Sequence, residues 1–153
     1  MQIIEARTLA HYQAAVSLFK EYAVGLGIDL AFQNFSQELE TLPQKYGPST
    51  GELWLIEDNG NFVGCAAIYQ IDKTTCELKR MYVQPTHRGQ KWGEALLEIA
   101  LQTAPKMGYQ AMRLDSLRRL TSAIQLYQRF GFQEIEPYNF NPESDVVYFE
   151  KIL

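Results

Sequence analysis

The sequence is poor in the residues that build metal sites and disulfide frameworks, with only two cysteines and two histidines among 153 residues. Ten residues separate Cys65 from Cys76, and neither belongs to a CxxC motif. His11 and His87 have no partner at the spacing of a metal site or a catalytic triad. We therefore expect no metal cofactor and no disulfide, and we interpret both cysteines as buried thiols in a reducing cytoplasm.

The sequence also lacks a long hydrophobic run and an excess of positive charge. No stretch approaches the roughly eighteen apolar residues of a membrane-spanning helix, and the first residues do not resemble a signal peptide. Lys and Arg number 14 against 18 Asp and Glu, so the formal net charge is -4. We therefore expect a cytoplasmic protein with neither membrane nor nucleic acid as a partner.

The overall composition is that of an ordinary folded domain. Hydrophobic residues make up 46% of the chain, charged residues 21% and aromatic residues 12%. This balance is far from the low hydrophobicity and high charge of disordered chains. The length suits one compact core, so we expect a single domain over residues 1–153.

The first part of the chain predicts one strand followed by helices. Residues 2–6 are apolar enough for a short strand, and apolar residues at steps of three and four predict a helix over residues 9–26. Thr8 can cap this helix, and the glycines at its end can terminate it. A shorter helix follows, with Asn34 as a candidate cap, before a loop rich in proline and glycine over residues 43–51.

Three antiparallel strands are predicted next, over residues 52–58, 61–71 and 76–83. Asn59-Gly60 joins the first two, and this dipeptide tolerates positive φ at both central positions of a tight hairpin turn. Pro85 ends the third strand because proline cannot donate to a ladder of hydrogen bonds. The segment therefore predicts an antiparallel meander.

The remaining chain predicts helices over residues 92–107 and 121–130 and strands over residues 109–117, 132–138 and 145–153. A helix between the fourth and fifth strands implies a parallel crossover at that point. The expected fold is therefore α/β, or α+β: a mixed, mostly antiparallel sheet of about seven strands flanked by about four helices on both faces.

Residues 87–93, HRGQKWG, lie in the turn between a predicted strand and a predicted helix. The first backbone N–H groups of such a helix point outward without partners, at the positive end of the helix dipole. Arg88 and Lys91 add positive charge, while Gly89 and Gly93 remove side chains that would keep a phosphate from the backbone. The stretch therefore predicts a pyrophosphate site, or alternatively only a solvated turn.

The turn resembles the signature of the GNAT family of acetyl-coenzyme A-dependent N-acetyltransferases. That signature is Arg or Gln, two residues, Gly, any residue, and Gly or Ala, and it falls on Arg88 to Gly93 with Lys91 in place of the first Gly. The segments CELKRMYVQPTHRG and AIQLYQRFGF also resemble the family, and the order of elements agrees from Leu53 to Phe132. Leu120 stands where the family often has asparagine.

The resemblance implies acetyl-CoA as the acyl donor, bound in a notch where the fourth and fifth strands splay apart. Its pantetheine arm would bond to the main chain of the fourth strand, where the N–H of Val83 would also meet the oxyanion. Its phosphates would meet the N–H groups of the turn. The binding residues implied are Met81, Tyr82, Val83, Arg88, Gly89, Gln90, Lys91, Trp92, Gly93 and Glu94.

Two catalytic residues are also implied by the resemblance. Glu77 lies eleven residues before Arg88, where some members of the family have a general-base glutamate. A base is needed because an alkyl ammonium with a pKa of about 10.4 is mostly protonated at neutral pH. Tyr127 stands where the family has a tyrosine that protonates or stabilises the leaving thiolate of coenzyme A.

Each catalytic residue also has a structural interpretation. Glu77 is alternatively an exposed strand residue paired with Lys79 or Arg80. Tyr127 is alternatively a helix residue packed beside Ala123 and Phe130. The sequence leaves both alternatives open.

The expected activity is transfer of an acetyl group from acetyl-CoA to a primary amine by direct attack in a ternary complex. In the family the acceptor usually meets the first two helices and the last strands, here residues 22–46 and 138–148. Acidic residues in these segments would suit a cationic small molecule, amino acid or protein amine, or simply solvent. These acids are Asp29, Glu38, Glu40, Glu143 and Asp145.

Two other functions stay open from the sequence. One is a non-catalytic acyl-CoA sensor, which the departures at Lys91 and Leu120 favour. The other is an interaction domain whose turn binds simple anions. Dimers are frequent in the family, so pairing of the final strands in a homodimer is also an expectation.

Overall fold

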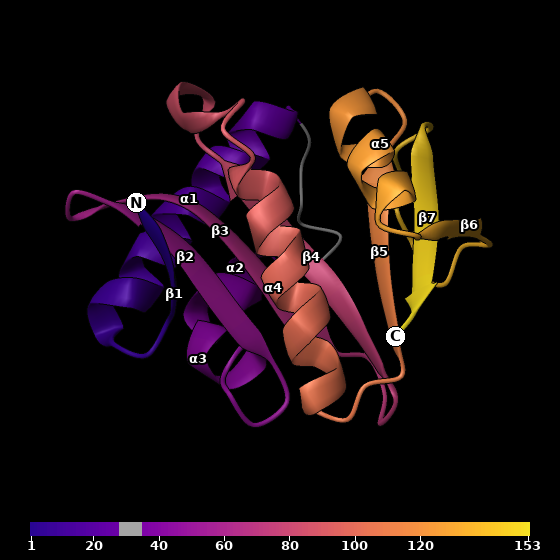
Figure 1. The fold of residues 1–153 in the computed structure, drawn as a ribbon, viewed down its shortest axis with the longest axis horizontal. Helices are drawn as coiled ribbons and strands as arrows, with labels where there is room; N and C mark the ends of the chain where they lie inside the picture. Colours follow the sequence, from indigo (N-terminus) through magenta and orange to yellow (C-terminus); the bar gives the residue numbers. More distant parts are fainter. Residues whose placement is uncertain (28–34) are drawn as a thin grey trace.

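A computed structural model describes residues 1–27 and 35–153 and shows one mixed sheet with helices on both faces (Figure 1). The strand order is β1-β2-β3-β4-β5-β7-β6. The strands are β1 (Gln2–Glu5), β2 (Glu52–Asp58), β3 (Asn61–Gln70), β4 (Thr75–Val83), β5 (Ala111–Leu117), β6 (Gln133–Ile135) and β7 (Val146–Ile152). The helices are α1 (Leu9–Leu26), α2 (Phe35–Glu40), α3 (Leu42–Lys45), α4 (Trp92–Lys106) and α5 (Thr121–Arg129).

The pairing of the strands confirms the predicted mixed sheet. Only β4 and β5 are parallel, because α4 carries the chain back between them, and the other neighbours are antiparallel. In Figure 1, α4 and α5 lie in front of the sheet, and α1, α2 and α3 lie behind it. The predicted α/β architecture with helices on both faces is therefore confirmed.

Local signals in the sequence act as expected at the first helix and the hairpin. The Thr8 hydroxyl accepts a hydrogen bond from the His11 N–H at 3.2 Å, and Gly27 ends α1 in the left-handed conformation at φ 66°. Asn59 and Gly60 both have positive φ, 50° and 82°. The predicted cap and hairpin turn are confirmed.

Two elements differ from the sequence-based expectation. The single short helix expected before the loop is two, α2 and α3, with Pro43 in the first turn of α3. Residues 1–27 and 35–153 therefore contain five α-helices, where about four helices were expected. The predicted cap Asn34 lies outside the described residues. The strand expected over residues 132–138 pairs only from Gln133 to Ile135, and Pro137 has no N–H to continue a ladder.

The sheet separates two hydrophobic cores. The first lies between the sheet and helices α4 and α5, and it includes Trp54, Leu96 and Tyr127. The second lies between β2, β3 and helices α1 and α3, and it includes Phe19 and Leu42. Strands β2 and β3 are buried on both faces, which explains their nearly continuous apolar sequence.

A β-bulge interrupts β4 at its centre. Cys65 of β3 is opposite Tyr82, but Ala67 is opposite Lys79, so one residue of β3 faces two residues of β4. Arg80 has a positive φ of 56°, which is rare for a residue other than glycine. A bulge bends its strand and re-aims side chains, and the Arg80 side chain points toward α2.

The Arg80 side chain ends in a buried ion pair with Glu38 of α2. The Nε and Nη2 atoms of Arg80 lie 2.8 and 2.7 Å from Glu38 Oε2. Lys45 and the Tyr46 hydroxyl bind the other oxygen, Oε1. Burial alone would raise the pKa of Glu38, but the charges of Arg80 and Lys45 outweigh it, so this pKa lies below its usual value.

Strands β4 and β5 pair only at their first residues. The parallel ladder joins Thr75–Glu77 to Ala111–Arg113 and then stops, although β4 continues to Val83 and β5 to Leu117. The two strands, both described in full, therefore diverge. The predicted splay of the fourth and fifth strands is confirmed, and it leaves the later part of the β4 edge without a strand partner.

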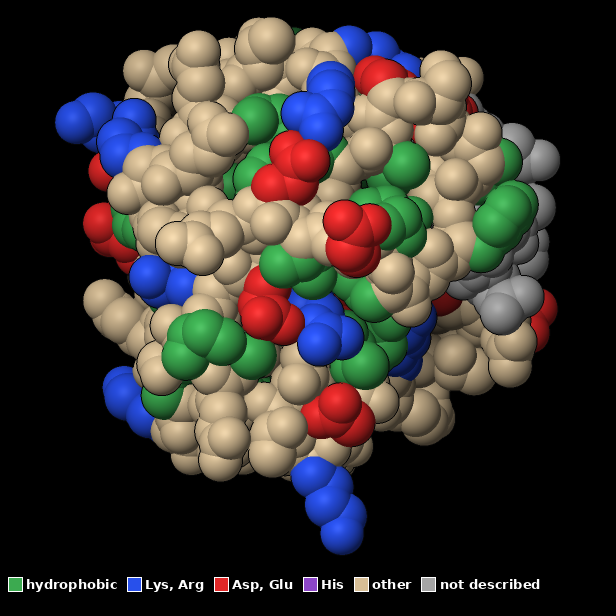
Figure 2. All heavy atoms as spheres, turned by 90° about the vertical axis from the view of Figure 1, so that its right-hand side faces the viewer, with side chains coloured by type: hydrophobic (Ala, Val, Ile, Leu, Met, Phe, Trp, Pro, Cys, Tyr) green, Lys and Arg blue, Asp and Glu red, His purple; other side chains and the backbone are tan. Residues whose placement is uncertain are grey.

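The surface and the cysteines can be compared with the expectations from composition. Figure 2 faces the side formed by β6, β7 and α5, where acidic and basic side chains intermingle and neither sign dominates. Cys65 and Cys76 are buried and free, as predicted. Within residues 1–27 and 35–153, no helix has the length and apolar character to span a membrane.

We expect Glu38→Ala to lower the free energy of unfolding at about pH 7 by about 3–5 kcal/mol, because it leaves the buried Arg80 guanidinium without its counter-charge. The folded-state pKa of Glu38 is lowered from 4.5. The ion pair therefore stabilises the fold fully at pH values above the ordinary pKa of 4.5. This stabilisation is lost as the pH falls through the lower pKa that Glu38 has in the folded state. Urea unfolding at neutral and acidic pH measures both effects.

The matched control is Glu40→Ala, since Glu40 lies two residues further along the same helix and is exposed. It should leave the unfolding midpoint nearly unchanged. A loss of less than about 1 kcal/mol for Glu38→Ala, the range of surface ion pairs, would contradict the importance of the buried pair.

Candidate active site

A cavity of about 100 Å³ lies where β4 and β5 diverge. Its walls come from α1, from both strands and from α5. The lining residues are Tyr22, Leu78, Lys79, Arg80, Met81, Leu114, Asp115, Ser116, Leu120, Ala123 and Tyr127. Of the residues predicted from the sequence, the cavity brings together Met81 and Tyr127. Such a cavity between diverging strands can hold a narrow acyl chain beside the free β4 edge.

The predicted phosphate-binding turn lies at the end of β4 and at the start of α4. Lys91 is the N-cap residue and makes no side-chain capping bond. The first helical hydrogen bond runs from the Ala95 N–H to the Lys91 carbonyl at 3.0 Å. The N–H groups of Trp92, Gly93 and Glu94 precede that bond and point out of the helix end, where they can bind an anion.

The two glycines of this turn leave its backbone accessible. A Cβ atom at Gly89 or Gly93 would meet no other protein atom within 4 Å. Gly89 is explained by its positive φ of 80°. Gly93 has no such φ, so neither conformation nor internal packing requires glycine there. Close approach of a ligand to the helix end would require it, and the residues present fit a bound pyrophosphate.

The backbone conformation at Lys91 shows how the turn accommodates the departure from the family signature. It adopts the left-handed conformation, with φ 65° and ψ 19°. The signature has glycine at this position, the residue that adopts this conformation without strain. The backbone path of the turn is therefore kept although the residue has changed.

The other predicted binding residues divide into structural and accessible groups. The Arg88 Nε donates to the Val83 carbonyl at 2.8 Å, so this side chain holds the turn against the end of β4. The Tyr82 hydroxyl bonds to Glu21 of α1 at 3.3 Å, and Tyr82 is paired with Cys65 of β3. Trp92 packs against the first core. Gln90 is exposed.

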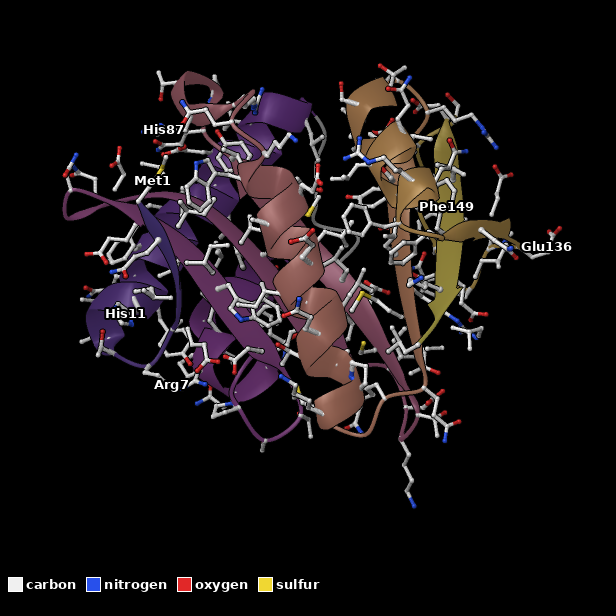
Figure 3. The ribbon with its side chains drawn as sticks, in the orientation of Figure 1. Met1, Arg7, His11, His87, Glu136 and Phe149 are labelled. Carbon is white, nitrogen blue, oxygen red and sulfur yellow. The ribbon has the colours of Figure 1, made fainter. Side chains whose placement is uncertain are left out.

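The start of α4 is also linked to the end of α5. Arg129 donates to a carboxylate oxygen of Glu94 at 2.6 Å. This ion pair joins the two helices that cover the first core. The Nε2 atom of His87, which Figure 3 labels, lies 3.1 Å from a carboxylate oxygen of Asp58.

Glu77 is buried, contrary to the alternative of an exposed strand residue. Its side chain is 1% exposed, and its carboxylate lies 3.4 Å from the Lys79 Nζ. Burial raises the pKa of Glu77, and Asp115 adds to the increase, while Lys79 opposes it. Glu77 does not line the cavity itself but lies beside it, next to Lys79, in a position suited to receive a proton.

Tyr138 belongs to the surroundings of Glu77. Its hydroxyl is buried and makes no well-formed hydrogen bond. It nevertheless lies close enough to lower the pKa of Glu77, while burial and the Glu77 charge raise the pKa of Tyr138. The sequence analysis named Tyr138 only as the start of an acceptor segment.

Tyr127 lies between the cavity and the first core. Its ring packs edge-on against Phe132 and tilted against Phe149, which Figure 3 shows between α5 and β7. Ala123 and Phe130, the neighbours of the structural alternative, pack against the same core. Burial raises the pKa of Tyr127, so its hydroxyl stays protonated and can donate a hydrogen bond.

The acidic residues expected to attract an amine are mostly engaged in ion pairs. Glu38 is paired with Arg80, and Arg119 binds Asp145 at 2.7 Å and lies 3.8 Å from Glu143. Glu40 is exposed, and Asp29 lies outside the described residues.

Sequence reasoning missed Asp115, although a signal was present. In β5, the charged residues Arg113 and Asp115 alternate with the buried residues Met112 and Leu114. Such alternation marks a strand with one face away from the apolar core. In the described part of the chain, no group of three or more His, Cys, Asp or Glu could hold a metal ion.

Comparison with known proteins places this geometry in a family. The profile of the acetyltransferase (GNAT) domain matches residues 49–134. An uncharacterised N-acetyltransferase of Schizosaccharomyces pombe is 42% identical over 133 residues, or 86% of this chain and 82% of that protein. These two matches cover the turn at residues 87–93.

Solved structures share the fold. A Streptococcus agalactiae acetyltransferase has a TM-score of 0.82 at 23% identity, covering 99% of this chain and 98% of the other. An acetyltransferase of Salmonella typhimurium, solved with its cofactor acetyl-CoA, has a TM-score of 0.75 at 21% identity, covering 99% and 93%. The predicted acyltransferase class is thereby confirmed at the level of the family. This chain belongs to the GNAT family of acetyltransferases.

Proposed function

We propose that this protein transfers the acetyl group of acetyl-CoA to a primary amine by direct attack in a ternary complex. The observation that carries the proposal is the cavity between the diverging β4 and β5, with Tyr127 in its wall. The accessible turn at Gly89 and Gly93 lies at the end of β4. Together they offer separate places for an acyl chain and for phosphates.

The main chain does most of the donor binding in this proposal. Between Met81 and Val83 the β4 edge has no strand partner on the β5 side, and its N–H and C=O groups would bond the amide groups of the pantetheine arm. The Val83 N–H would meet the thioester oxygen. The N–H groups from Gly89 to Glu94 would hold the phosphates. The thioester of acetyl-CoA supplies an activated acetyl group.

Glu77 would act as the general base. The raised pKa of its carboxylate brings it closer to neutral pH, where a base can both accept and release a proton. The charged or titratable groups that interact with it include Lys79, Asp115, Tyr138 and Tyr69. A proton leaving the acceptor ammonium would pass to Glu77 directly or through a water.

Tyr127 would donate a hydrogen bond to the sulfur of the leaving thiolate. Its raised pKa keeps the phenol protonated at working pH. A buried donor is stronger than one in water, since solvent does not compete for it. This role needs only the hydroxyl, so it can be separated from the packing of the ring.

The sensor alternative differs from the enzyme in one observable. A sensor binds acyl-CoA without turnover, and Leu120, which lines the cavity where the family often has asparagine, is the residue that favours it. A cytoplasmic location, a single domain over residues 1–153 and a homodimer stay predictions from the sequence.

The test combines binding with turnover. At a ligand concentration of about a hundred times its dissociation constant, acetyl-CoA should add about 2.7 kcal/mol to the free energy of unfolding. This raises the melting midpoint, whereas ATP and NAD should not raise it. Release of free coenzyme A thiol is then measured with a panel of primary amines.

Tyr127→Phe is the matched variant because it removes only the hydroxyl. It should lower kcat by about a hundredfold and keep the thermal shift with acetyl-CoA. No shift with any coenzyme A compound would overturn the proposal, and a shift without turnover would favour the sensor.

Glu77→Gln should lower kcat/KM by about 10²–10⁴-fold at neutral pH. In the native protein, kcat/KM should fall as the pH is lowered through the raised pKa of Glu77, because the base must be ionised. In the variant it should keep rising with pH toward the pKa of the amine, since only the neutral amine can then react. A pH profile of both proteins measures this difference.

Glu98→Gln is the control for this change, since Glu98 is exposed on α4. It should have the native profile. A Glu77→Gln variant with native activity at neutral pH would show that the base lies elsewhere.

Lys91→Gly should keep acetyl-CoA binding and leave the protein at least as stable. A lysine in the left-handed conformation is strained by about 1–2 kcal/mol, and glycine removes that strain. Glycine also increases the conformational entropy of the unfolded chain, which lowers the free energy of unfolding by about 0.4–1 kcal/mol. Lys91→Val should lower the melting midpoint, because a β-branched residue fits this conformation poorly. Thermal unfolding with and without acetyl-CoA measures both, and native behaviour of Lys91→Val would contradict the conformational role.

A further inference from the structure

We propose that Asp115 binds the ammonium group of the acceptor, which is therefore a cationic primary amine with no carboxylate beside the amino group. This inference rests on the proposed acetyltransferase function. It names a specificity residue and narrows the class of acceptor, neither of which follows from the resemblance to the family.

Asp115 lies at the end of the proposed site where the acetyl group would be transferred. It lies in β5 beyond Arg113, the last residue that pairs with β4, and it lines the cavity together with Tyr127. In the antiparallel pairing with β7, Asp115 is opposite Tyr148. An acceptor that reaches the cavity from this side meets Asp115 where the strands open.

The carboxylate of Asp115 lacks a cationic partner. Its hydrogen-bond donor is the Asn141 side-chain amide at 3.4 Å, which is a long bond. In the part of the chain that the structure describes, no Lys, Arg or His nitrogen lies within 4.0 Å of it, and residues 28–34 contain none of these residue types. A carboxylate in such a place is suited to bind a cation from outside.

Several neighbouring acids are paired with cations of the protein. Glu38 is bound by Arg80 and Lys45, Glu150 by Arg113 at 2.7 Å, and Glu77 lies by Lys79. Asp115 is the one acid among the described residues that line the cavity, and it has no such pair. The site therefore favours a ligand with one positive charge.

Tyrosines share the walls of the cavity with this carboxylate. Tyr22 and Tyr127 line the cavity together with Asp115, and Tyr148 is opposite Asp115 in the pairing of β5 with β7. The charge of Asp115 raises the pKa values of these three tyrosines. Aromatic faces attract ammonium groups, and the buried Tyr138 hydroxyl is available to accept a hydrogen bond.

The proton transfers follow from this placement. The ammonium docks on Asp115 and gives one proton to the ionised Glu77, whose pKa Asp115 also raises. The neutral nitrogen forms a bond to the acetyl carbon as the carbon–sulfur bond breaks. The second proton leaves the nitrogen as the amide forms, and it neutralises the thiolate. A carboxylate beside the amine would lie against Asp115 and be repelled.

Asp115→Asn tests the role of the charge, since asparagine keeps the shape and can still accept from Asn141. Its KM for the amine should rise about 10–100-fold, the loss of a charge-assisted hydrogen bond. Its thermal shift with acetyl-CoA should stay near the native value, because the proposed donor site does not include Asp115. Asp115→Glu, which keeps the charge, should retain a KM between those of the native protein and Asp115→Asn. Glu98→Gln, the exposed control, should retain the native KM.

A matched pair of acceptors tests the substrate class. The native protein should use 2-phenylethylamine with a kcat/KM at least about tenfold above that for phenylalanine, which adds a carboxylate beside the same amine. The preference should shrink in Asp115→Asn. If Asp115→Asn does not fold, the comparison of Asp115→Glu with the native protein on this pair replaces it.

The outcomes separate this inference from the proposed function. A native protein that acetylates amines, with an unchanged KM in Asp115→Asn or a preference for phenylalanine, overturns the inference and leaves the acetyltransferase intact. A native protein that neither binds acetyl-CoA nor acetylates any amine overturns both. A selective rise in KM for the amine supports the inference.

Discussion

The buried ion pair between Arg80 of β4 and Glu38 of α2 is the interaction on which the geometry of the site depends. Two charges are removed from water there, and they are tolerated because Lys45 and Tyr46 complete the hydrogen bonds of the carboxylate. The pair holds the side chain of Arg80 on the α2 side at a left-handed backbone position. This position makes the bulge, which lies three residues beyond Glu77, the last residue of β4 that pairs with β5.

The two halves of the site use different chemistry as a result. In the proposed function, the donor half would consist of backbone groups, the free edge of β4 and the first N–H groups of α4, so a change such as lysine for glycine at position 91 keeps the path of the turn. The proposed acceptor half would consist of side chains, and the charge of Asp115 raises the pKa values of Glu77 and Tyr138 there. Substitutions should therefore alter the acceptor more readily than the donor.

Much of the fold could be predicted because its signals are local. The capping of α1 by Thr8 and the positive φ at Asn59 and Gly60 depend on neighbouring residues alone. The bulge at Arg80 could not be read from the sequence, since arginine has no preference for that conformation and is held in it by a residue 42 positions away. The same holds for Asp115, whose importance arises from the absence of a partner in three dimensions.

The central strand β4 contains buried charged residues, which are unfavourable for stability. Such residues can therefore indicate a functional site. A strand between two neighbours should be apolar on both faces, yet β4 buries three charged residues, Glu77, Lys79 and Arg80, within four positions. Desolvation raises the pKa of Glu77 and lowers that of Lys79, so each group is brought toward neutral pH by its burial. Replacing them with apolar residues would often stabilise such a strand. Proton transfer needs groups whose pKa values lie near working pH, and burial in the middle of a rigid sheet supplies both the shift and the fixed position.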